Sequence, residues 1–244
     1  MGERDRIFAE SAGEPGPFRF DERVAEVFPD MISRSVPGYA FVLETLTRLA
    51  RRLVQPYSRV YDLGCSLGAA TLAMRSGIDQ PGVECIAVDN SPAMVERARA
   101  HVAAFRSSVP AQLALADLRD VVIENASLVV MNFTLQFLPQ DERADILARV
   151  HSGLRPGGAL VLAEKVHHHQ PGMESLIQQV HLDFKRDQGY SELEISQKRQ
   201  ALENVLVTDT LAEHDRRLEE VGFMERAMLC QHYNFAAILA RKTS

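Results

Sequence analysis

Short apolar runs alternate with helical segments through the middle of the chain, and this alternation restricts the fold more than any other feature. The runs occupy residues 59–63, 84–89, 111–117, 127–133 and 159–164, with helical patterns at 68–74, 92–105 and 139–154. Ser91 suits the N-cap of the second of these helices, and Pro92 suits its first turn. Strands and helices that alternate at this spacing form right-handed βαβ units. The sequence therefore predicts an α/β protein with a doubly wound, mostly parallel sheet.

The flanking segments extend this core. Residues 1 to about 35 are interpreted as an irregular arm, because Gly13, Pro15, Gly16 and Pro17 break any helix there, and a helical stripe follows over 38–53. Residues 170–212 are helical and polar, whereas 225–231 and 234–241 predict an antiparallel hairpin at the sheet edge, which makes seven strands. We expect one domain, made of an N-terminal arm with helices (1–55), a core (56–165), a helical insert (166–212) and a C-terminal helix with the hairpin (213–244).

Composition narrows the class of function. The 244 residues carry a net charge of −6, whereas a protein that grips RNA by its phosphates usually has a basic surface, so a small-molecule substrate is expected and direct nucleic-acid binding is not. No apolar run approaches the roughly 20 residues of a membrane helix, and the charged N-terminus lacks a secretory signal, so we expect a cytoplasmic protein. Cys65, Cys85 and Cys230 are too far apart in sequence to indicate a disulfide framework or a zinc site.

The loop after the first strand predicts a nucleoside site. It reads D-x-G-x-S-x-G from Asp62 to Gly68, with Gly64 and Ser66 between them. Glycines before a helix let the backbone approach a ligand, but Asp62 would repel the pyrophosphate that a dinucleotide-binding G-x-G-x-x-G loop holds, so an NAD-binding domain is a poor alternative. Asp62 is expected either to order the turn or to hold a cation such as an amino group. The loop resembles the first motif of class I S-adenosylmethionine-dependent enzymes, E/D-x-G-x-G-x-G, from which Ser66 departs.

Further residues lie at strand ends, where ligands bind in doubly wound sheets. Asp89 ends the second strand, and a carboxylate there can accept both ribose hydroxyls, although a turn or cap role is equally plausible for that residue alone. The resemblance implies that Asp117 receives the adenine amino group with Leu118 beside the ring, and that Asn132 lies beneath the sulfonium. Cys65 is interpreted as a small buried filler rather than a nucleophile.

Other motifs exclude some chemistries. The fourth strand is followed by NFTLQFLP, without the Pro-Pro-Tyr of many N-methyltransferases. His167, His168 and His169 are adjacent, so they do not converge on one ion in a regular helix or strand, and we expect a solvated loop and no metal. In the insert, Lys198 is expected on a solvated face paired with Glu194. Arg199 on the same helix is expected either on that face or turned inward toward a carboxylate, and the residues alone leave this open.

Several longer motifs carry a more specific resemblance. These are FDERVAEVFPDMISRSVPGY, YDLGCSLGAAT, DNSPAMVERAR, NFTLQFLP, GGALVLAEK and ISQKRQALENVL. Together they resemble the carboxy-S-adenosyl-L-methionine synthase family, in which Ser66 is the expected residue. The resemblance implies that the ligand is lined by Tyr39, Gly64, Cys65, Ser66, Asp89, Asn90, Asp117, Leu118 and Asn132. It also implies that Arg199 pairs with the added carboxylate, within one subunit or across a homodimer, and that the insert helps to cover the site. From the residues alone, Tyr39 could equally be a core aromatic residue at the start of a helix.

The resemblance implies a reaction as well. S-Adenosylmethionine and prephenate would give carboxy-S-adenosylmethionine and phenylpyruvate, and a tRNA carboxymethyltransferase would use the product for the 5-oxyacetic acid modification of wobble uridine. Two alternatives stay open at this point. One is an ordinary methyltransferase of a small molecule or RNA, and the other is a non-catalytic carrier of the ligand.

Overall fold

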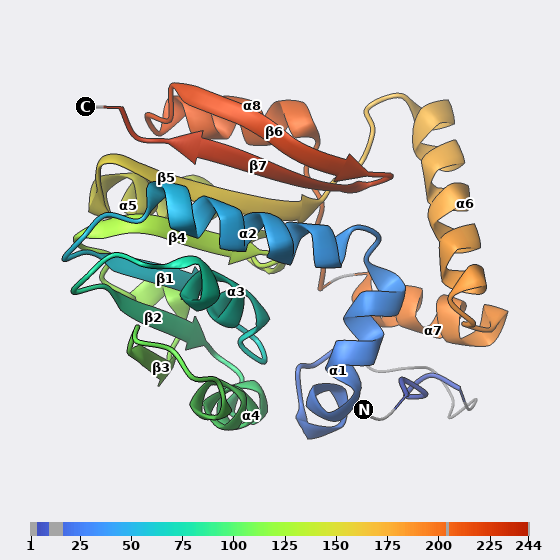
Figure 1. Ribbon diagram of the computed structural model, residues 1–244. Helices are drawn as coiled ribbons and strands as arrows, with labels where there is room; N and C mark the ends of the chain where they lie inside the picture. Colours follow the sequence, from blue (N-terminus) through green and yellow to red (C-terminus); the bar gives the residue numbers. More distant parts are fainter. Residues whose placement is uncertain (1–3, 10–16, 204, 244) are drawn as a thin grey trace.

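The computed structural model describes residues 4–9, 17–203 and 205–243, and its centre is a seven-stranded sheet (Figure 1). The strand order is β3-β2-β1-β4-β5-β7-β6. The first five strands are parallel, and β7 runs antiparallel to both β5 and β6. The strands are β1 (Arg59–Leu63), β2 (Glu84–Asp89), β3 (Ala111–Leu115), β4 (Ala126–Asn132), β5 (Leu154–Lys165), β6 (Glu225–His232) and β7 (Phe235–Arg241). The predicted fold class is confirmed.

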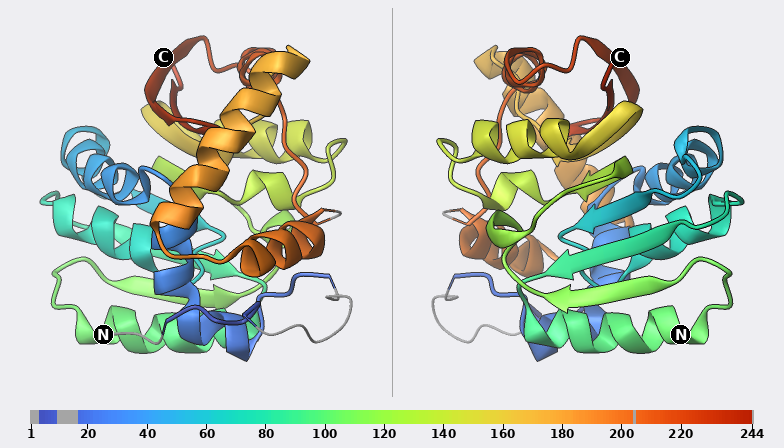
Figure 2. Two further views of the ribbon diagram at one scale, coloured as in Figure 1. Left: turned by 90° about the vertical axis from the view of Figure 1, so that its right-hand side faces the viewer. Right: turned by 90° about the vertical axis from the view of Figure 1, so that its left-hand side faces the viewer.

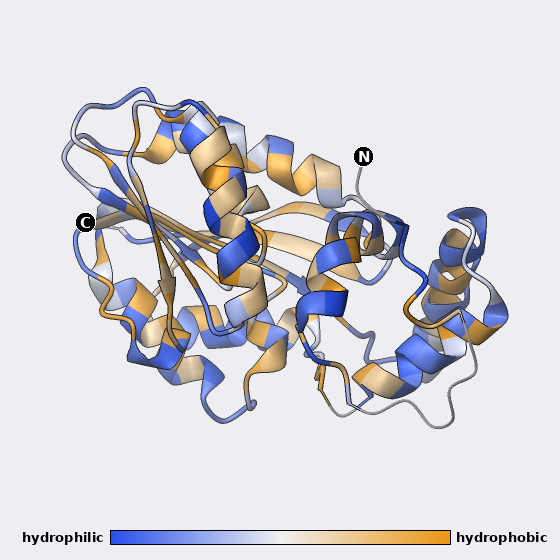
Figure 3. Cartoon of the chain, turned by 90° about the horizontal axis from the view of Figure 1, so that it is seen from below, coloured by the Kyte–Doolittle hydropathy of each residue, from blue (hydrophilic) through white to orange (hydrophobic). Residues whose placement is uncertain are grey.

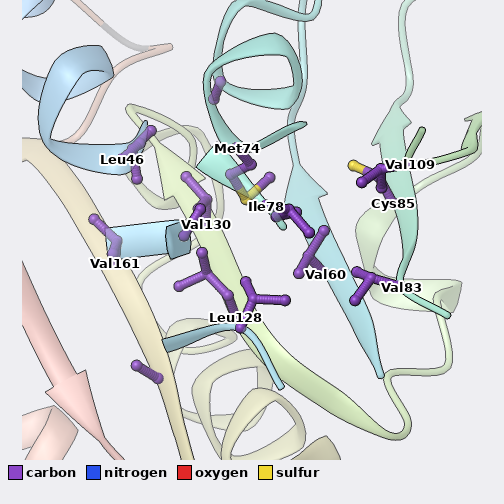
Figure 4. Close-up of a cluster of buried hydrophobic side chains, with 14 of the residues drawn as sticks. Leu46, Val60, Met74, Ile78, Val83, Cys85, Val109, Leu128, Val130 and Val161 are labelled. Carbon is purple, nitrogen blue, oxygen red and sulfur yellow. The ribbon is translucent and has the colours of Figure 1, made fainter. Parts of the chain in front are cut away.

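Helices cover both faces of the sheet. On one face lie α2 (Tyr39–Leu53) and α3 (Ala69–Gly77), with α4 (Pro92–Ala104) beside α3, and on the other lie α5 (Arg143–Gly153) and α8 (Leu211–Glu220). The first face is closed by Leu46 of α2 and Met74 of α3, which pack on Val60, Leu128, Val130 and Val161 (Figure 4). Figure 3 shows hydrophobic residues concentrated in the strands, while the helices carry both hydrophobic and hydrophilic residues. Burial on both faces explains why β4 is an unbroken apolar run.

The predicted bounds agree closely for β1 and β2 and less closely elsewhere. The third strand ends at Leu115, so Asp117 lies beyond it as the N-cap of a short 3-10 helix, η1 (Leu118–Asp120). The fifth strand begins at Leu154, because it continues through the Pro-Gly-Gly segment that was expected to separate it from α5. These differences shift residues along the sheet edge without changing which elements form.

The interpretation of residues 1–35 as an irregular arm was wrong over its second half. A helix, α1 (Glu22–Ser35), occupies that part, and the Asp21 carboxylate caps it by accepting the Val24 amide at 3.0 Å. The helix-breaking Gly13, Pro15 and Gly16 lie outside the described residues, and Pro17 precedes the helix. Buried residues at helical spacing, Val24, Val27 and Met31, explain why the segment folds as it does.

The insert forms two further helices that cross the carboxyl edge of the sheet. These are α6 (Pro171–Asp187) and α7 (Glu192–Leu202), and Figure 2 shows them beside α1 at this edge. Several hydrogen bonds join α1 to the insert. Among them, Arg34 Nε donates to the carbonyl of Gln188 at 2.8 Å, and His181 Nε2 lies 2.9 Å from the carbonyl of Ser35. None of the helices in the described part of the chain is long and apolar enough to cross a membrane.

A buried ion cluster fastens the last part of the insert to the core. The Asp209 carboxylate lies 2.6 Å from the Arg143 guanidinium on α5 and 2.8 Å from that of Arg217 on α8. Arg143 also donates to the carbonyl of Val207 at 2.8 Å. Burial would raise the pKa of Asp209, but hydrogen bonds from Arg143, Gln140 and Arg217 outweigh it and lower the pKa to about 2.

Replacing Asp209 by asparagine therefore leaves two arginines facing each other without the carboxylate. We expect Asp209→Asn to lower the free energy of unfolding at pH 7 by about 3–5 kcal/mol. Because the folded pKa is lowered, the carboxylate stabilises the protein above the unfolded value of about 3.9, and the difference between wild type and variant shrinks as the pH falls below it. Urea unfolding followed by far-UV circular dichroism at pH 7 and at about pH 2.5 measures this.

The control is Asp215→Asn, which breaks the exposed pair between Asp215 and Arg226. It is expected to cost less than about 1 kcal/mol. Equal losses for the two variants would contradict a special role for the buried cluster.

Candidate functional site

A cavity of about 250 Å³ lies at the carboxyl edge of the sheet, between the sheet, α1 and the insert. Strand order reverses between β1 and β4, and in doubly wound sheets this reversal opens a crevice for ligands. Seven of the residues expected at the site line the cavity: Gly64, Ser66, Asp89, Asn90, Asp117, Leu118 and Asn132. Tyr39, Cys65 and Arg199 are outside the set of described residues that line it.

The loop after β1 is held in a conformation that explains Ser66. The φ angle of Ser66 is 48°, in the left-handed region where glycine is usual, so the serine occupies the glycine position of the motif without changing the turn. Its amide donates to the Asp89 carboxylate at 2.8 Å, which holds the loop against β2. Gly64, with φ 82°, has no room for a side chain, because a Cβ would lie 2.4 Å from the Thr134 side chain.

Asp89 serves the turn and also faces the cavity. One carboxylate oxygen accepts the Ser66 amide, and the other accepts the Ser91 amide at 2.9 Å. Burial raises the pKa of Asp89, although the backbone donors oppose it. Each carboxylate oxygen can accept a second hydrogen bond, so the turn role and a ligand role are compatible.

The two carboxylate oxygens of Asp62 differ in their hydrogen bonding. Oδ2 accepts the Thr71 hydroxyl of α3 at 2.6 Å, whereas Oδ1 is buried and has no hydrogen-bond partner among the described residues. Burial raises the pKa of Asp62 to about 6. Burial and the charge of Asp62 both raise the pKa of Tyr39, which begins α2 nearby. A buried carboxylate oxygen without a partner suits a ligand that brings a positively charged donor.

Asn132 ends β4 with a second unsatisfied acceptor. Its Oδ1 is buried and has no partner in the part of the chain that the structure describes. The next residue, Phe133, has φ 61°, and its ring lies between those of Tyr39 and Phe235, with centroids 6.3 and 5.9 Å away. Tyr39 therefore reaches the site through Phe133 rather than by lining the cavity.

The turn after β4 is fixed by a buried carboxylate on β5. Glu164 accepts the amides of Leu135 and Gln136 at 2.8 and 3.0 Å. Burial raises the pKa of Glu164 to about 8, although these donors oppose it. Gln136 in turn accepts the Lys165 amide at 2.9 Å. The contacts that Glu164 and Lys165 make with this turn leave no signal in the sequence, since the partners are far apart along the chain.

Two other expected residues have their own contacts. Hydrogen bonds from Arg119 lower the pKa of Asp117, whose Oδ2 lies 2.7 Å from the Arg119 guanidinium, so an adenine amino group would share that carboxylate with an arginine. Cys65 is buried, and burial strongly raises the pKa of its thiol, which fits a filler rather than a nucleophile.

The expectation for Lys198 was wrong. Lys198 is buried rather than solvated, and its Nζ donates to the Ser35 hydroxyl at 2.9 Å. Glu194 does not pair with it, because the Glu194 carboxylate caps α7 at Ser191. The missed signal is spacing: Lys198 follows Ile195 by three positions, on the face of α7 that docks against α1. Arg199, one position further, is exposed in the single chain.

Two more lysines at the cavity were not expected, Lys165 at the end of β5 and Lys185 on α6. The three adjacent histidines lie in a loop, and His167 contacts the Thr208 hydroxyl at 3.1 Å. No group of three or more histidine, cysteine, aspartate or glutamate residues within the described ranges could hold a metal ion.

Comparisons with known proteins agree with this geometry. A family model described as a methyltransferase domain matches residues 60–158. Carboxy-S-adenosyl-L-methionine synthase of Klebsiella pneumoniae is 52% identical over 243 residues, which cover 100% of this chain and 98% of that protein. The synthase of Erwinia tasmaniensis is 54% identical over 242 residues, covering 99% and 98%. The chain belongs to the carboxy-S-adenosyl-L-methionine synthase family. The resemblance inferred from the sequence motifs is confirmed, and the chain is an enzyme of this family.

More distant structures share the fold. Human N-acetylserotonin methyltransferase, solved with S-adenosylmethionine, superposes with a TM-score of 0.61 at 18% identity, covering 91% of this chain and 56% of that one. The synthase family therefore shares the methyltransferase architecture. In this chain Gly64 and Asn132 line the cavity, whereas the buried Asp62 lies outside the set of described residues that line it.

The buried carboxylate of Asp62 is expected to destabilise the ligand-free protein. Because its folded pKa is raised to about 6, the folded state binds more protons than the unfolded state between about pH 4 and 6, so stability falls as the pH rises through this window. Asp62→Asn should remove a cost of up to about 3 kcal/mol at pH 8 and less of it at pH 5. Chemical unfolding of wild type and variant at both pH values measures the difference.

Asp79→Asn, at an exposed position, serves as the control and should change stability by less than about 0.5 kcal/mol at either pH. A variant at Asp62 that destabilises the ligand-free protein equally at both pH values would show that the carboxylate is a structural hydrogen-bonding group only.

Proposed function

We propose that the protein makes carboxy-S-adenosylmethionine from S-adenosylmethionine and prephenate. The observation that carries this proposal is the extent of the identity with the synthases, which spans the whole chain, while the general methyltransferase model stops at residue 158. The shared part thus includes α6 and α7, which close the cavity. A synthase and a methyltransferase can share the nucleoside-binding core, so the regions outside it are the ones that distinguish their chemistry.

Under this proposal the sheet edge holds the nucleoside and amino-acid parts of the ligand. Gly64 and Ser66 approach the methionine part, and Asp62 offers its free oxygen to the amino group. Asp89 accepts the ribose hydroxyls, and Asn132 lies beside the sulfonium. The adenosine end of the ligand is contacted by Asp117, Asn90 and Leu118. S-Adenosylmethionine, when bound, supplies the methyl group that is carboxylated.

The reaction balances without an added oxidant or metal. Prephenate gives up its ring carboxyl as carbon dioxide and its ring hydroxyl as hydroxide when it aromatises to phenylpyruvate. The hydroxide takes one methyl proton and leaves as water, and the carbon dioxide becomes the carboxylate on that methyl carbon. The residues around the cavity need only position the two substrates and exclude water, and the aromatic rings of Phe20, Phe133 and Phe137 provide apolar walls for this.

The proposal extends to assembly and location. We infer a homodimer in which the exposed Arg199 reaches the site of either subunit, and no direct contact with nucleic acid or membrane, in keeping with the net charge of −6. We place the enzyme in the cytoplasm, where its free cysteines stay reduced. A tRNA carboxymethyltransferase would use the product to modify wobble uridine.

The direct test is the mass of the product formed from S-adenosylmethionine and prephenate. We expect S-adenosylmethionine plus one carboxyl group, together with phenylpyruvate, in equal amounts. S-Adenosylhomocysteine as the product would instead identify a methyltransferase, and tight binding of carboxy-S-adenosylmethionine without turnover would identify a carrier. Chromatography with mass detection separates these outcomes.

Arg199 is expected to recognise the new carboxylate. Arg199→Ala should weaken the binding of carboxy-S-adenosylmethionine by about 10-fold to 100-fold, because one charged hydrogen-bonded pair is lost. The affinity for S-adenosylmethionine should change by less than about twofold. Isothermal titration with both ligands measures the selectivity. Arg186→Ala, which removes an exposed arginine of α6 paired with Glu192, is the matched control. Equal weakening of the two ligands by Arg199→Ala would refute the carboxylate role.

A further inference from the structure

The lysines of this chain are concentrated at one place. There are 27 basic residues, but only four of them are lysines. Three of the four, Lys165, Lys185 and Lys198, line the cavity, and they come from β5, α6 and α7. The fourth, Lys242, donates to the carbonyls at the end of α5, including that of Leu154 at 2.8 Å. A protein with a net charge of −6 therefore gathers cations in its cavity.

Two of these cations differ from the third in their contacts. The ammonium groups of Lys165 and Lys185 form no hydrogen bond or ion pair within the described residues, although both side chains are half-buried. Lys198 is different, because Ser35 accepts its proton and the Asp5 carboxylate lies 3.7 Å away. Burial and the neighbouring cations lower the pKa of Lys185 to about 7. Burial also lowers the pKa of Lys165, although the charge of Glu174 opposes this. Partly desolvated cations of this kind are costly unless an anion joins them.

The strand register places this cationic group next to the end of β4. Asn132 pairs with Ala163 in the parallel ladder, and Lys165, two residues after Ala163, projects on the same face of the sheet. Lys165 also pairs with Phe235 of β7, whose ring packs on Phe133. Lys165 thus lies beside the sulfonium position of the proposed function, next to the ring pair of Phe133 and Phe235.

We propose that Lys165 and Lys185 bind the α-keto carboxylate end of the second substrate, with Lys198 contributing positive charge behind them. This inference rests on the proposed function, which supplies prephenate as that substrate. Prephenate has two carboxylates, and only the one on its pyruvyl side chain remains in phenylpyruvate.

The choice between the two carboxylates follows from the chemistry. The ring carboxylate loses its charge as it leaves as carbon dioxide, so an ammonium bound to it would stabilise the starting state more than the transition state and slow the reaction. The pyruvyl carboxylate keeps its charge throughout. Its two oxygens and the neighbouring keto oxygen can accept from both ammonium groups, so these lysines anchor the substrate without opposing its decarboxylation.

The test measures binding of prephenate and phenylpyruvate to enzyme loaded with S-adenosylhomocysteine, which has no methyl group to carboxylate. Lys165→Gln and Lys185→Gln should each weaken both acids at least about tenfold, and the affinity for S-adenosylhomocysteine should change less than about twofold. Arg52→Gln, which removes an exposed cation at the end of α2, is the charge control and should leave both acids unaffected. Lys185→Arg keeps the charge and should retain most of the binding.

Three results would overturn the inference. Unchanged affinity in the glutamine variants would show that the lysines do not bind the substrate. Weaker binding of prephenate with unchanged binding of phenylpyruvate would show that the lysines contact the ring carboxylate instead. A ligand-free Lys185→Gln protein that is less stable than wild type in thermal unfolding would make Lys185 a structural residue, because removing an unpaired cation should not destabilise the fold.

Turnover is measured separately, so failure of the proposed function can be recognised. If wild type binds both acids through the lysines but forms no carboxy-S-adenosylmethionine, the proposed function fails and the anion site stands. If wild type forms the product and the glutamine variants bind both acids normally, the anion site fails and the proposed function stands.

Discussion

The reversal of strand order between β1 and β4 is the constraint on which the rest of the structure depends. From β1 the chain builds the sheet toward β3, and from β4 it builds in the opposite direction, so the connections after these two strands diverge and leave a crevice at the carboxyl edge. Asp89, Asn132 and Lys165 lie at that edge because parallel strands end there together. The covering elements, α1, α6 and α7, lie at the same edge (Figure 1). Residues of these helices and of the sheet line the cavity there.

The polar groups of the site lower the free energy of unfolding of the ligand-free protein, and interactions elsewhere in the protein offset this loss. Within the described residues, Asp62 and Asn132 keep buried oxygens without hydrogen-bond partners. Burial of Lys165 and Lys185 disfavours their charged form, as their lowered pKa values show. Each lowers the stability of the ligand-free state, and each gains a partner when a suitable ligand binds. The sheet, buried on both faces, and the ion cluster around Asp209 provide the compensating stability. Binding therefore stabilises the fold at the positions where the chain alone does not.

The sequence predicted the sheet well because buried parallel strands leave a local signal, an apolar run followed by a glycine-containing turn, as at β1 and β2. It predicted α1 poorly because helix-breaking residues precede it, and the stripe from Val24 to Met31 was not used. The interpretation of Lys198 failed for a tertiary reason. The sequence of a weakly amphipathic helix such as α7 does not indicate which of its faces is buried. Docking of α7 on α1 determines the buried face. The same reason hid Lys165 and Lys185, which meet only after the insert folds over the sheet.

The turn after β4 explains why the insert has to supply polar groups. In this chain the turn replaces the Pro-Pro-Tyr of many methyltransferases, and Glu164 occupies two of its amides, those of Leu135 and Gln136. These amides are therefore not free to bind an anionic substrate. The apolar residues of the turn and of α1 contribute walls but no charge. A second substrate that carries carboxylates must find its cations elsewhere, and the lysines that β5 and the insert bring to the cavity are the groups placed to provide them.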